Sequence, residues 1–259
     1  MKYNIQIILL AIALTFTACK KDKNQIDNII NIQYLITEGT TESGITVRLE
    51  SNKKNLSTGY NTIYIVLKDA HGNSLKDKEI TLTPMMDMGM MQHSSPVEQP
   101  IYNPSTNAYQ GAVVFTMPSG DMGSWNMTIS FDTEDVVLDI NIQESKLKET
   151  GSYSGNDGNK YFITLLPHQP WTVGMNDFQI LVNRNESKFP TEDDFTITVN
   201  PQMLSMGHGS PNNAHPVSIG NGKYQGRVNF TMTGDWRLYF NLSKDGELII
   251  EEAYIDILF

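Results

Sequence analysis

The chain has 259 residues, with 29 acidic against 19 basic side chains and a formal net charge of −10. This charge disfavours nucleic acid as a partner, because a polyanion binds through clustered Lys and Arg. Hydrophobic residues make up 39% and charged residues 19%, which is typical of a globular chain and excludes a disordered one. The single Cys excludes an intrachain disulfide, and the 13 Met residues are the unusual component.

The first 18 residues have the character of a signal peptide. Lys2 gives a short basic start, and the run from Ile5 to Ala18 is apolar apart from one Gln and two Thr. This run is too short for a helix that spans a bilayer. Ala18 comes directly before Cys19, in a stretch that resembles the lipobox of bacterial lipoproteins. The resemblance implies cleavage after residue 18 and lipidation of Cys19.

Residues 19–34 are polar enough to offer little surface for burial, so we expect a tether between the lipid and a folded body. The charged residues at 20–22 loosely resemble the surface-export signals of Bacteroidetes lipoproteins. We therefore expect an anchor in a bacterial membrane of the cell envelope, with the outer membrane favoured. The sequence leaves open which face of that membrane carries the protein.

The sequence after the tether contains an internal repeat with an offset of 115 residues, which is close to the length of an immunoglobulin-like domain. The repeated residues are Gly59 and Gly174, Asn61 and Asn176, Tyr109 and Tyr224, Phe115 and Phe230, and Met117 and Met232. The Gly, Ser and Asn residues at 148–158 predict a linker. The predicted domains are therefore 35–147 and 159–259.

Both copies show the period of two that is typical of half-buried strands. In one run every second residue is apolar: Trp236, Leu238, Phe240 and Leu242. Asp245 and Gly246 lie between two such runs and predict a tight hairpin. We therefore predict an all-β fold of two tandem immunoglobulin-like antiparallel β-sandwiches.

Two loops rich in Met and His occupy matching places in the copies. Pro84–His93 has five Met in seven residues, and Pro201–His208 ends in Met, Gly and His. We align Met88–Met90, with sequence MGM, with Met206–His208, with sequence MGH. In an extended chain, residues two apart point to the same side and can converge on one ion. Thioether and imidazole suit Cu(I), whereas Ca²⁺ and Mg²⁺ prefer oxygen and zinc usually needs Cys, several His or a carboxylate.

Packing is the alternative interpretation, because Met also fills cores and forms adaptable contact surfaces for protein partners. The second copy has His208 at the position aligned with Met90 of the first. This difference favours metal binding, since both residues can be soft ligands but only Met is apolar. His93 and His215 follow their loops and are either further ligands or solvated residues. Met122 is expected to be exposed and is a further candidate for the first site.

The order of these elements resembles the YtkA/FixH-like family of exported β-sandwich domains. The motifs are PQMLSMGHG and GNGKYQGRVNFTMTGDW in the second copy, and PMMDMGMMQH and AYQGAVVFTMPSGDMGSW in the first. That family is associated with copper handling and with assembly of copper-containing oxidases, so the resemblance implies a copper site in each copy. The ligands that it implies are Met203, Met206, His208 and Met232 in the second copy, and Met85, Met88 and Met90 in the first.

We therefore expect a lipid-anchored copper-binding accessory protein that sequesters Cu(I) or exchanges it with a donor or acceptor protein. An enzyme is not expected, because the sequence has no zinc-protease, phosphate-binding or nucleophile motif. The alternative is a structural or adhesive module that presents Tyr102, Tyr153 and Trp171 to a protein or glycan. Under the copper hypothesis, the Met-only first site should keep Cu(I) in mild acid. The second should release it, because an imidazole must be neutral to ligate.

Overall fold

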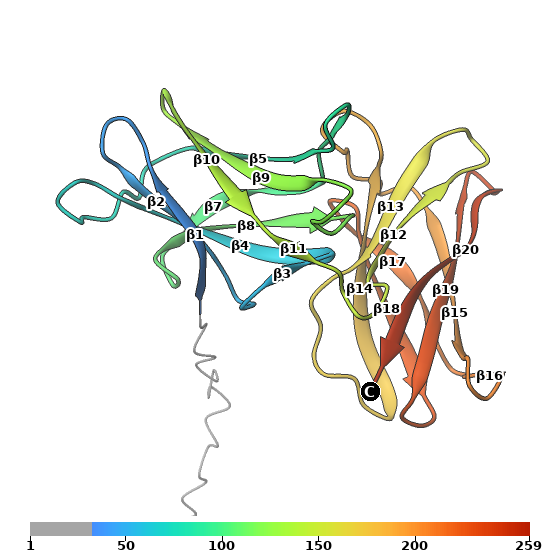
Figure 1. The fold of residues 1–259 in the computed structure, drawn as a ribbon. Coiled ribbons are helices and arrows are strands. Elements are labelled where there is room, and N and C mark those ends of the chain that lie inside the picture. Colours follow the sequence, from blue (N-terminus) through green and yellow to red (C-terminus); the bar gives the residue numbers. More distant parts are fainter. Residues whose placement is uncertain (1–32) are drawn as a thin grey trace, which may run out of the picture. The chain divides into compact units, whose positions relative to one another are not determined.

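The computed structural model describes residues 33–259, and all regular secondary structure in that range is β-strand (Figure 1). The predicted signal peptide at 1–18, the lipidation site Cys19 and the tether as far as residue 32 lie outside the described residues. The described part of the chain contains no helix long and apolar enough to cross a membrane. The first strand begins at Tyr34, which is the last residue of the predicted tether.

The first sandwich has two antiparallel sheets that enclose one core. The order of the larger sheet is β1-β2-β4-β8-β7, and the bounds are Tyr34–Thr40, Thr46–Ser51, Gly59–Lys68, Ala108–Phe115 and Val97–Asn103. The order of the smaller sheet is β10-β9-β5-β6, and the bounds are Glu134–Ile140, Ser124–Phe131, Ile80–Asp87 and Gln92–His93. A parallel pair is formed by β3 (Leu56–Ser57) and β11 (Ile142–Gln143).

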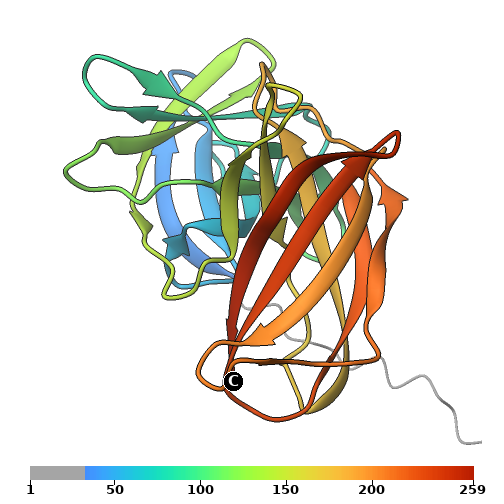
Figure 2. The ribbon, with the colours of Figure 1, turned by 90° about the vertical axis from the view of Figure 1, so that its right-hand side faces the viewer.

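The second sandwich repeats both sheets strand for strand (Figure 2, yellow to red). The larger sheet has the order β12-β13-β14-β18-β17, with bounds Thr150–Ser154, Lys160–Leu165, Gly174–Arg184, Lys223–Phe230 and Ala214–Gly220. The smaller sheet has the order β16-β15-β19-β20, with bounds His208–Gly209, Thr196–Met203, Asp235–Lys244 and Glu247–Leu258. The predicted class of two tandem immunoglobulin-like sandwiches is confirmed.

The predicted linker at 148–158 is wrong in its central part. The strand β12 (Thr150–Ser154) lies there and pairs with β13, so the stretch is the first hairpin of the second sandwich. Tyr153 attaches this strand to the opposite sheet, because its hydroxyl donates to Tyr254 O at 2.7 Å and accepts from Tyr254 N at 2.9 Å. The Gly and Asn residues that suggested a linker form the hairpin turn at 155–159. The second sandwich therefore begins at β12.

The period of two predicted the core positions correctly. The alternating apolar residues of β19 are at most 1% exposed: Trp236, Leu238, Phe240 and Leu242. The matching residues of β9 are at most 2% exposed: Trp125, Met127, Ile129 and Phe131. Burial of each large apolar side chain contributes about 1.5–3 kcal/mol. Each sandwich has its own cluster of such residues, so each copy has its own hydrophobic core.

The repeated Tyr of the Tyr-x-Gly motif joins distant parts of each sandwich. The Tyr224 hydroxyl accepts a hydrogen bond from Phe195 N at 3.0 Å and donates one to Glu192 O at 3.0 Å. Tyr109 makes the same two kinds of bond to the segment 75–78 in the first sandwich. Burial raises the pKa of Tyr224 to about 12, so its hydroxyl remains a neutral donor at ordinary pH. The motif is therefore repeated for structural reasons.

We expect Tyr224→Phe to lower the free energy of unfolding by about 2–4 kcal/mol, because it leaves the buried Phe195 amide and Glu192 carbonyl without a partner. Urea unfolding followed by circular dichroism measures the change. The matched control is Tyr254→Phe, because the Tyr254 hydroxyl has no hydrogen-bond partner within residues 33–259. Equal losses in the two variants would contradict the proposed role of Tyr224.

Candidate metal centre

Each sandwich carries a row of Trp, Met and His side chains across three neighbouring strands. In the second sandwich, Met203 on β15 lies directly opposite Trp236 on β19 and directly opposite His208 on β16. Residues directly opposite in an antiparallel pair point to the same face of the sheet, with Cβ atoms about 4.5–5.5 Å apart. These three residues form the second row, which faces inward because Met203 and Trp236 are buried.

The first sandwich has the same row. Met86 on β5 lies opposite Trp125 on β9 and opposite His93 on β6, and these residues form the first row. In the first sandwich, His93 therefore occupies the position that His208 has in the second. The sequence alignment had placed Met90 at this position. That alignment is wrong in three dimensions, because the loop between the paired Met and His is two residues longer in the first sandwich.

The Met of each row is buried and the His lies at the rim. Met86 is fully buried and Met203 is 5% exposed. The strands β6 and β16 are the outermost of their sheets, which brings both imidazoles to the edge. His208 is half-buried, and its ring stands edge to face against Trp236 with 5.8 Å between the ring centroids. Each row thus leads from a core thioether to an imidazole that solvent can reach.

A further Met lies beside the Trp of each row. Trp236 Nε1 donates a hydrogen bond to Met232 O at 3.0 Å, and Trp125 Nε1 donates one to Met117 O at 3.0 Å. Met232 is 37% exposed and Met117 is half-buried. Both residues follow strands of the larger sheet, β18 and β8, so they approach the row from the opposite layer. A second thioether is thereby brought to the end of each sandwich that holds the row.

The Gly of the Gly-x-Trp motif makes room for the row Met. Gly234 has a φ of +145°, and a Cβ at this position would occupy the place of the Met203 methyl group. Gly123 has a φ of +152°, and a Cβ there would lie 3.1 Å from Met86 Cε. A side chain at Gly234 would displace the Met203 methyl group, and one at Gly123 would clash with Asp87 O at 2.5 Å, so both copies need Gly two residues before Trp.

The row imidazoles retain free ring nitrogens. His208 Nδ1 is 3.1 Å from Gly209 O, so a proton on Nδ1 is donated to that carbonyl and Nε2 keeps its lone pair. The His93 imidazole has no hydrogen bond to any residue in the described range 33–259. A neutral imidazole with an available nitrogen is a common metal ligand, and a carbonyl on its other nitrogen orients the ring.

Several predicted Met ligands lie outside the rows. Met85 alternates with Met86, so it points to the outer face of β5. Met88 is half-buried against the edge of the core. Met90 is 98% exposed and Met206 is 60% exposed, each near the tip of its loop. Met85, Met88 and Met90 therefore do not converge as predicted, because strand alternation and the loop turn send them into three different environments.

His215 makes a structural contact. Its Nδ1 accepts a hydrogen bond from Val199 N at 3.1 Å, which joins β17 to β15. Gln99 does the same in the first sandwich, where Oε1 accepts from Leu82 N at 2.8 Å. An imidazole and an amide oxygen share the ability to accept this bond. We therefore assign His215 to the contact between the sheets and not to the row.

Met86 is the member of the rows that the sequence comparison missed. When the loops are aligned on the Gly of MGM and MGH, Met86 does not fall on Met203. Alignment on Pro84 and Pro201 would have placed Met86 on Met203, and the offset of 115 places the two row His residues on each other. The segment from the Pro to the row His differs in length between the two copies, so no single ungapped alignment contains both the Met match and the His match.

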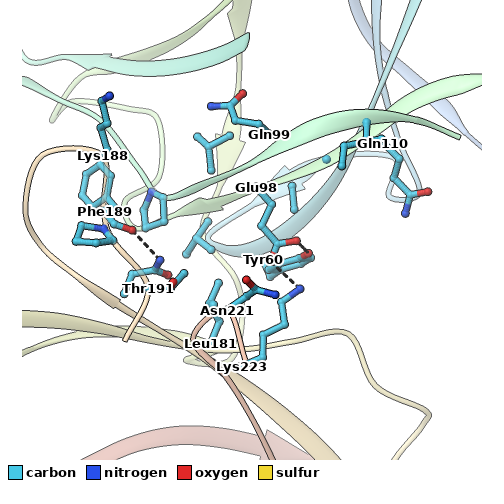
Figure 3. A pocket seen from close by; sticks show the side chains of 18 residues that line it. Tyr60, Glu98, Gln99, Gln110, Leu181, Lys188, Phe189, Thr191, Asn221 and Lys223 are labelled. Atoms are coloured by element: carbon cyan, nitrogen blue, oxygen red, sulfur yellow. Dashed lines mark hydrogen bonds and ion pairs between the residues drawn. The ribbon is translucent and has the colours of Figure 1, made fainter. Parts of the chain in front are cut away.

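A cavity of about 510 Å³ lies apart from the rows, lined by β7, β8 and the segment 181–191 (Figure 3). Glu98 Oε2 accepts a hydrogen bond from the Tyr60 hydroxyl at 3.0 Å, and Glu98 Oε1 pairs with Lys223 Nζ at 3.0 Å. Burial and then the charge of Glu98 raise the pKa of Tyr60 well above its usual range. Because these groups satisfy one another, they do not indicate a ligand.

The sheets define a β-sandwich module with two immunoglobulin-like domains. The chain belongs to the YtkA-like family, whose model matches residues 40–130 and 156–241, one region in each sandwich and together more than half of the chain. The resemblance seen in the motifs is thereby confirmed as two tandem YtkA-like domains. No curated protein matches the chain.

The solved structures that match the chain have low sequence identity and low TM-scores. The adhesin FdeC of Escherichia coli is 14% identical with a TM-score of 0.27, and the match covers 86% of this chain and 66% of that one. Invasin, a bacterial integrin-binding protein, is 10% identical with a TM-score of 0.27, over 88% of this chain and 38% of that one. Domains 5–6 of the S-layer protein SbsC are 15% identical with a TM-score of 0.28, over 88% and 98%.

Proposed function

We propose that the chain is a non-catalytic accessory protein that binds one Cu(I) ion at each row. The observation that carries this proposal is the repetition of the row in both sandwiches: a buried Met lies opposite a Trp and opposite a His at the sheet edge. Packing alone gives no reason to repeat an imidazole at an exposed edge. The proposed ligands are Met203 and His208 in one site, and Met86 and His93 in the other.

The donor set suits a soft ion. Thioether sulfur and neutral imidazole favour Cu(I), and Met232 and Met117 offer a third donor at the same end of their sandwiches. Within residues 33–259, no group of three or more His, Cys, Asp or Glu side chains is placed to hold a metal. The described residues therefore favour a site based on Met and His over the oxygen-rich sites of Ca²⁺ or the Cys-rich sites of zinc.

The cellular setting belongs to the same proposal. A lipid on Cys19 would hold both rows at a bacterial membrane of the cell envelope, with the outer membrane favoured. Sites at the ends of tethered sandwiches suit sequestration of Cu(I) or its exchange with a donor or acceptor protein. Neither task needs a catalytic group, and none of the proposed ligands is a nucleophile or a general base in this role.

Tryptophan emission tests the proposal directly. Trp125 and Trp236 each lie in a row, so Cu(I) held by the adjacent Met and His should perturb both indoles and change their emission up to two equivalents of metal. The titration is done anaerobically, with Ag(I) as a redox-inert substitute for Cu(I). The third Trp is outside the rows, so Trp171→Phe should keep the response. Absence of metal uptake would reject the proposal and favour the alternative of a structural or adhesive module.

A further inference from the structure

The first sandwich carries three exposed thioethers next to its row. Met90 is 98% exposed, Met91 is 59% exposed and Met122 is 65% exposed. Because these side chains are exposed, their burial contributes no free energy to the stability of the monomer. They extend from the β5–β6 loop and from the connection at 118–124, which contains a four-residue insertion relative to the second sandwich.

The two turns that hold these thioethers are internally bonded. In the β5–β6 loop, Met88 N donates to Met91 O at 3.0 Å, and Gly89 N donates to Asp87 Oδ1 at 2.8 Å. In the insertion, the backbones of Gly120 and Gly123 exchange two hydrogen bonds of 3.0 Å. These bonds define the backbone of both turns, so the three Met residues lie at the end of the sandwich that contains the first row.

The insertion packs directly against the loop and the row. A Cβ on Gly123 would lie 2.5 Å from Asp87 O, 3.0 Å from Met88 Cγ and 3.1 Å from Met86 Cε. Met122 is the residue before Gly123, and Met88 is half-buried against the core that contains Met86. Met86 and Met88 therefore both lie close to Gly123, at the end of the first sandwich that also carries the exposed Met residues.

The second sandwich lacks this extension. Its loop is two residues shorter and carries Met206 as its exposed thioether, and the connection from Met232 to Trp236 is four residues shorter than its counterpart. Both rows contain the same donors. The difference in the number of exposed sulfurs therefore affects how an ion reaches the site and not which donors hold it. The two sandwiches therefore differ in the number of exposed thioethers that lie at the end with the row.

We propose that Met90, Met91 and Met122 form an exchange relay, through which the first row gains Cu(I) from a soluble carrier or passes it to one. The proposal rests on the proposed function. In each step one bond forms from copper to the incoming donor, either a thioether sulfur or an imidazole nitrogen, as one bond to the leaving donor breaks. Copper stays Cu(I), so no oxidant or proton is needed. Donors held near the row raise the effective concentration of the incoming ligand, which speeds exchange without strengthening the final site.

The test compares rates with affinities in the full chain. A His208→Ala background removes the proposed second site, and Met90, Met91 and Met122 are then all replaced by Leu, which keeps the size but removes the sulfur. We expect transfer of Cu(I) to a chromogenic chelator to slow at least about tenfold, with equilibrium affinity changed less than about threefold. Met175→Leu is the matched control, because Met175 is 48% exposed on β14 outside the relay.

Three results would overturn the relay. An unchanged transfer rate would mean that the exposed sulfurs take no part in exchange. A fall in affinity as large as the fall in rate would make them ligands of the resting site. Absence of Cu(I) binding in the His208→Ala background, while the unmodified chain binds it, would remove the first site itself, whereas absence of binding in the unmodified chain would reject the proposed function as a whole.

Discussion

Replacing His208 by Ala is expected to reduce the number of tightly bound Cu(I) ions from two to one. His208 is the imidazole of the second row, with Nδ1 directed to Gly209 O and Nε2 available. Loss of a residue that only orients a ligand typically costs 10–100-fold in metal affinity, so loss of a direct ligand should cost at least about 100-fold. Competition with a chromogenic Cu(I) chelator under anaerobic conditions measures both affinity and stoichiometry.

The first row supplies the reciprocal experiment. His93→Ala should remove the other equivalent, and the double variant should retain no tight site. His71 and His168 are exposed His residues outside the rows, so His71→Ala and His168→Ala should leave both equivalents in place. If His93→Ala left the stoichiometry at two while Met90→Ala reduced it, the alignment of His208 with Met90 would be right and the first row would not be the site.

Replacing Met86 by Leu is expected to lower the Cu(I) affinity of the first site by at least about tenfold, because the change removes the buried sulfur of the row. Leu is close to Met in volume, so the cost in stability should stay below about 1.5 kcal/mol. Chelator competition in a His208→Ala background isolates the first site. Thermal unfolding of the metal-free protein checks that its core is intact.

The neighbouring residue is the matched control. Met85 precedes Met86 but points to the outer face of β5, so Met85→Leu should leave the affinity unchanged within about threefold. Met203→Leu should repeat the effect of Met86→Leu in the second site. A loss of affinity with Met85→Leu and none with Met86→Leu would show that the ion lies on the outer face of the sheet, away from the first row.

The pairing of His93 with Met86 also changes the expected pH response. The sequence predicted a Met-only first site that keeps Cu(I) in mild acid and a second site that releases it. With an imidazole in both rows, the two sites have the same kinds of donor, so their affinities should respond to pH alike. A pH titration of the His93→Ala and His208→Ala variants separates the two responses.

Local sequence patterns were sufficient to predict most of the fold. The period of two identified the buried face of β9 and of β19, because alternate residues of a strand point to opposite sides. Asp245 and Gly246 have φ values of 53° and 85°, which is the geometry that the predicted hairpin requires. The boundary at 148–158 was less predictable, because Gly, Ser and Asn are equally common in a linker and in the turn that follows β12.

The sequence by itself determined the repeat, the β-sandwich class and the kind of donors that each copy contains, since these depend on residue type and local spacing. Only the tertiary structure decided which donors meet. Met86 faces His93 because β5 and β6 pair in one register, and Met203 faces His208 because β15 and β16 pair in the same way. A shift of one residue would turn either Met to the opposite face, and register is set by the packing of the whole sheet, which the loop sequence does not contain.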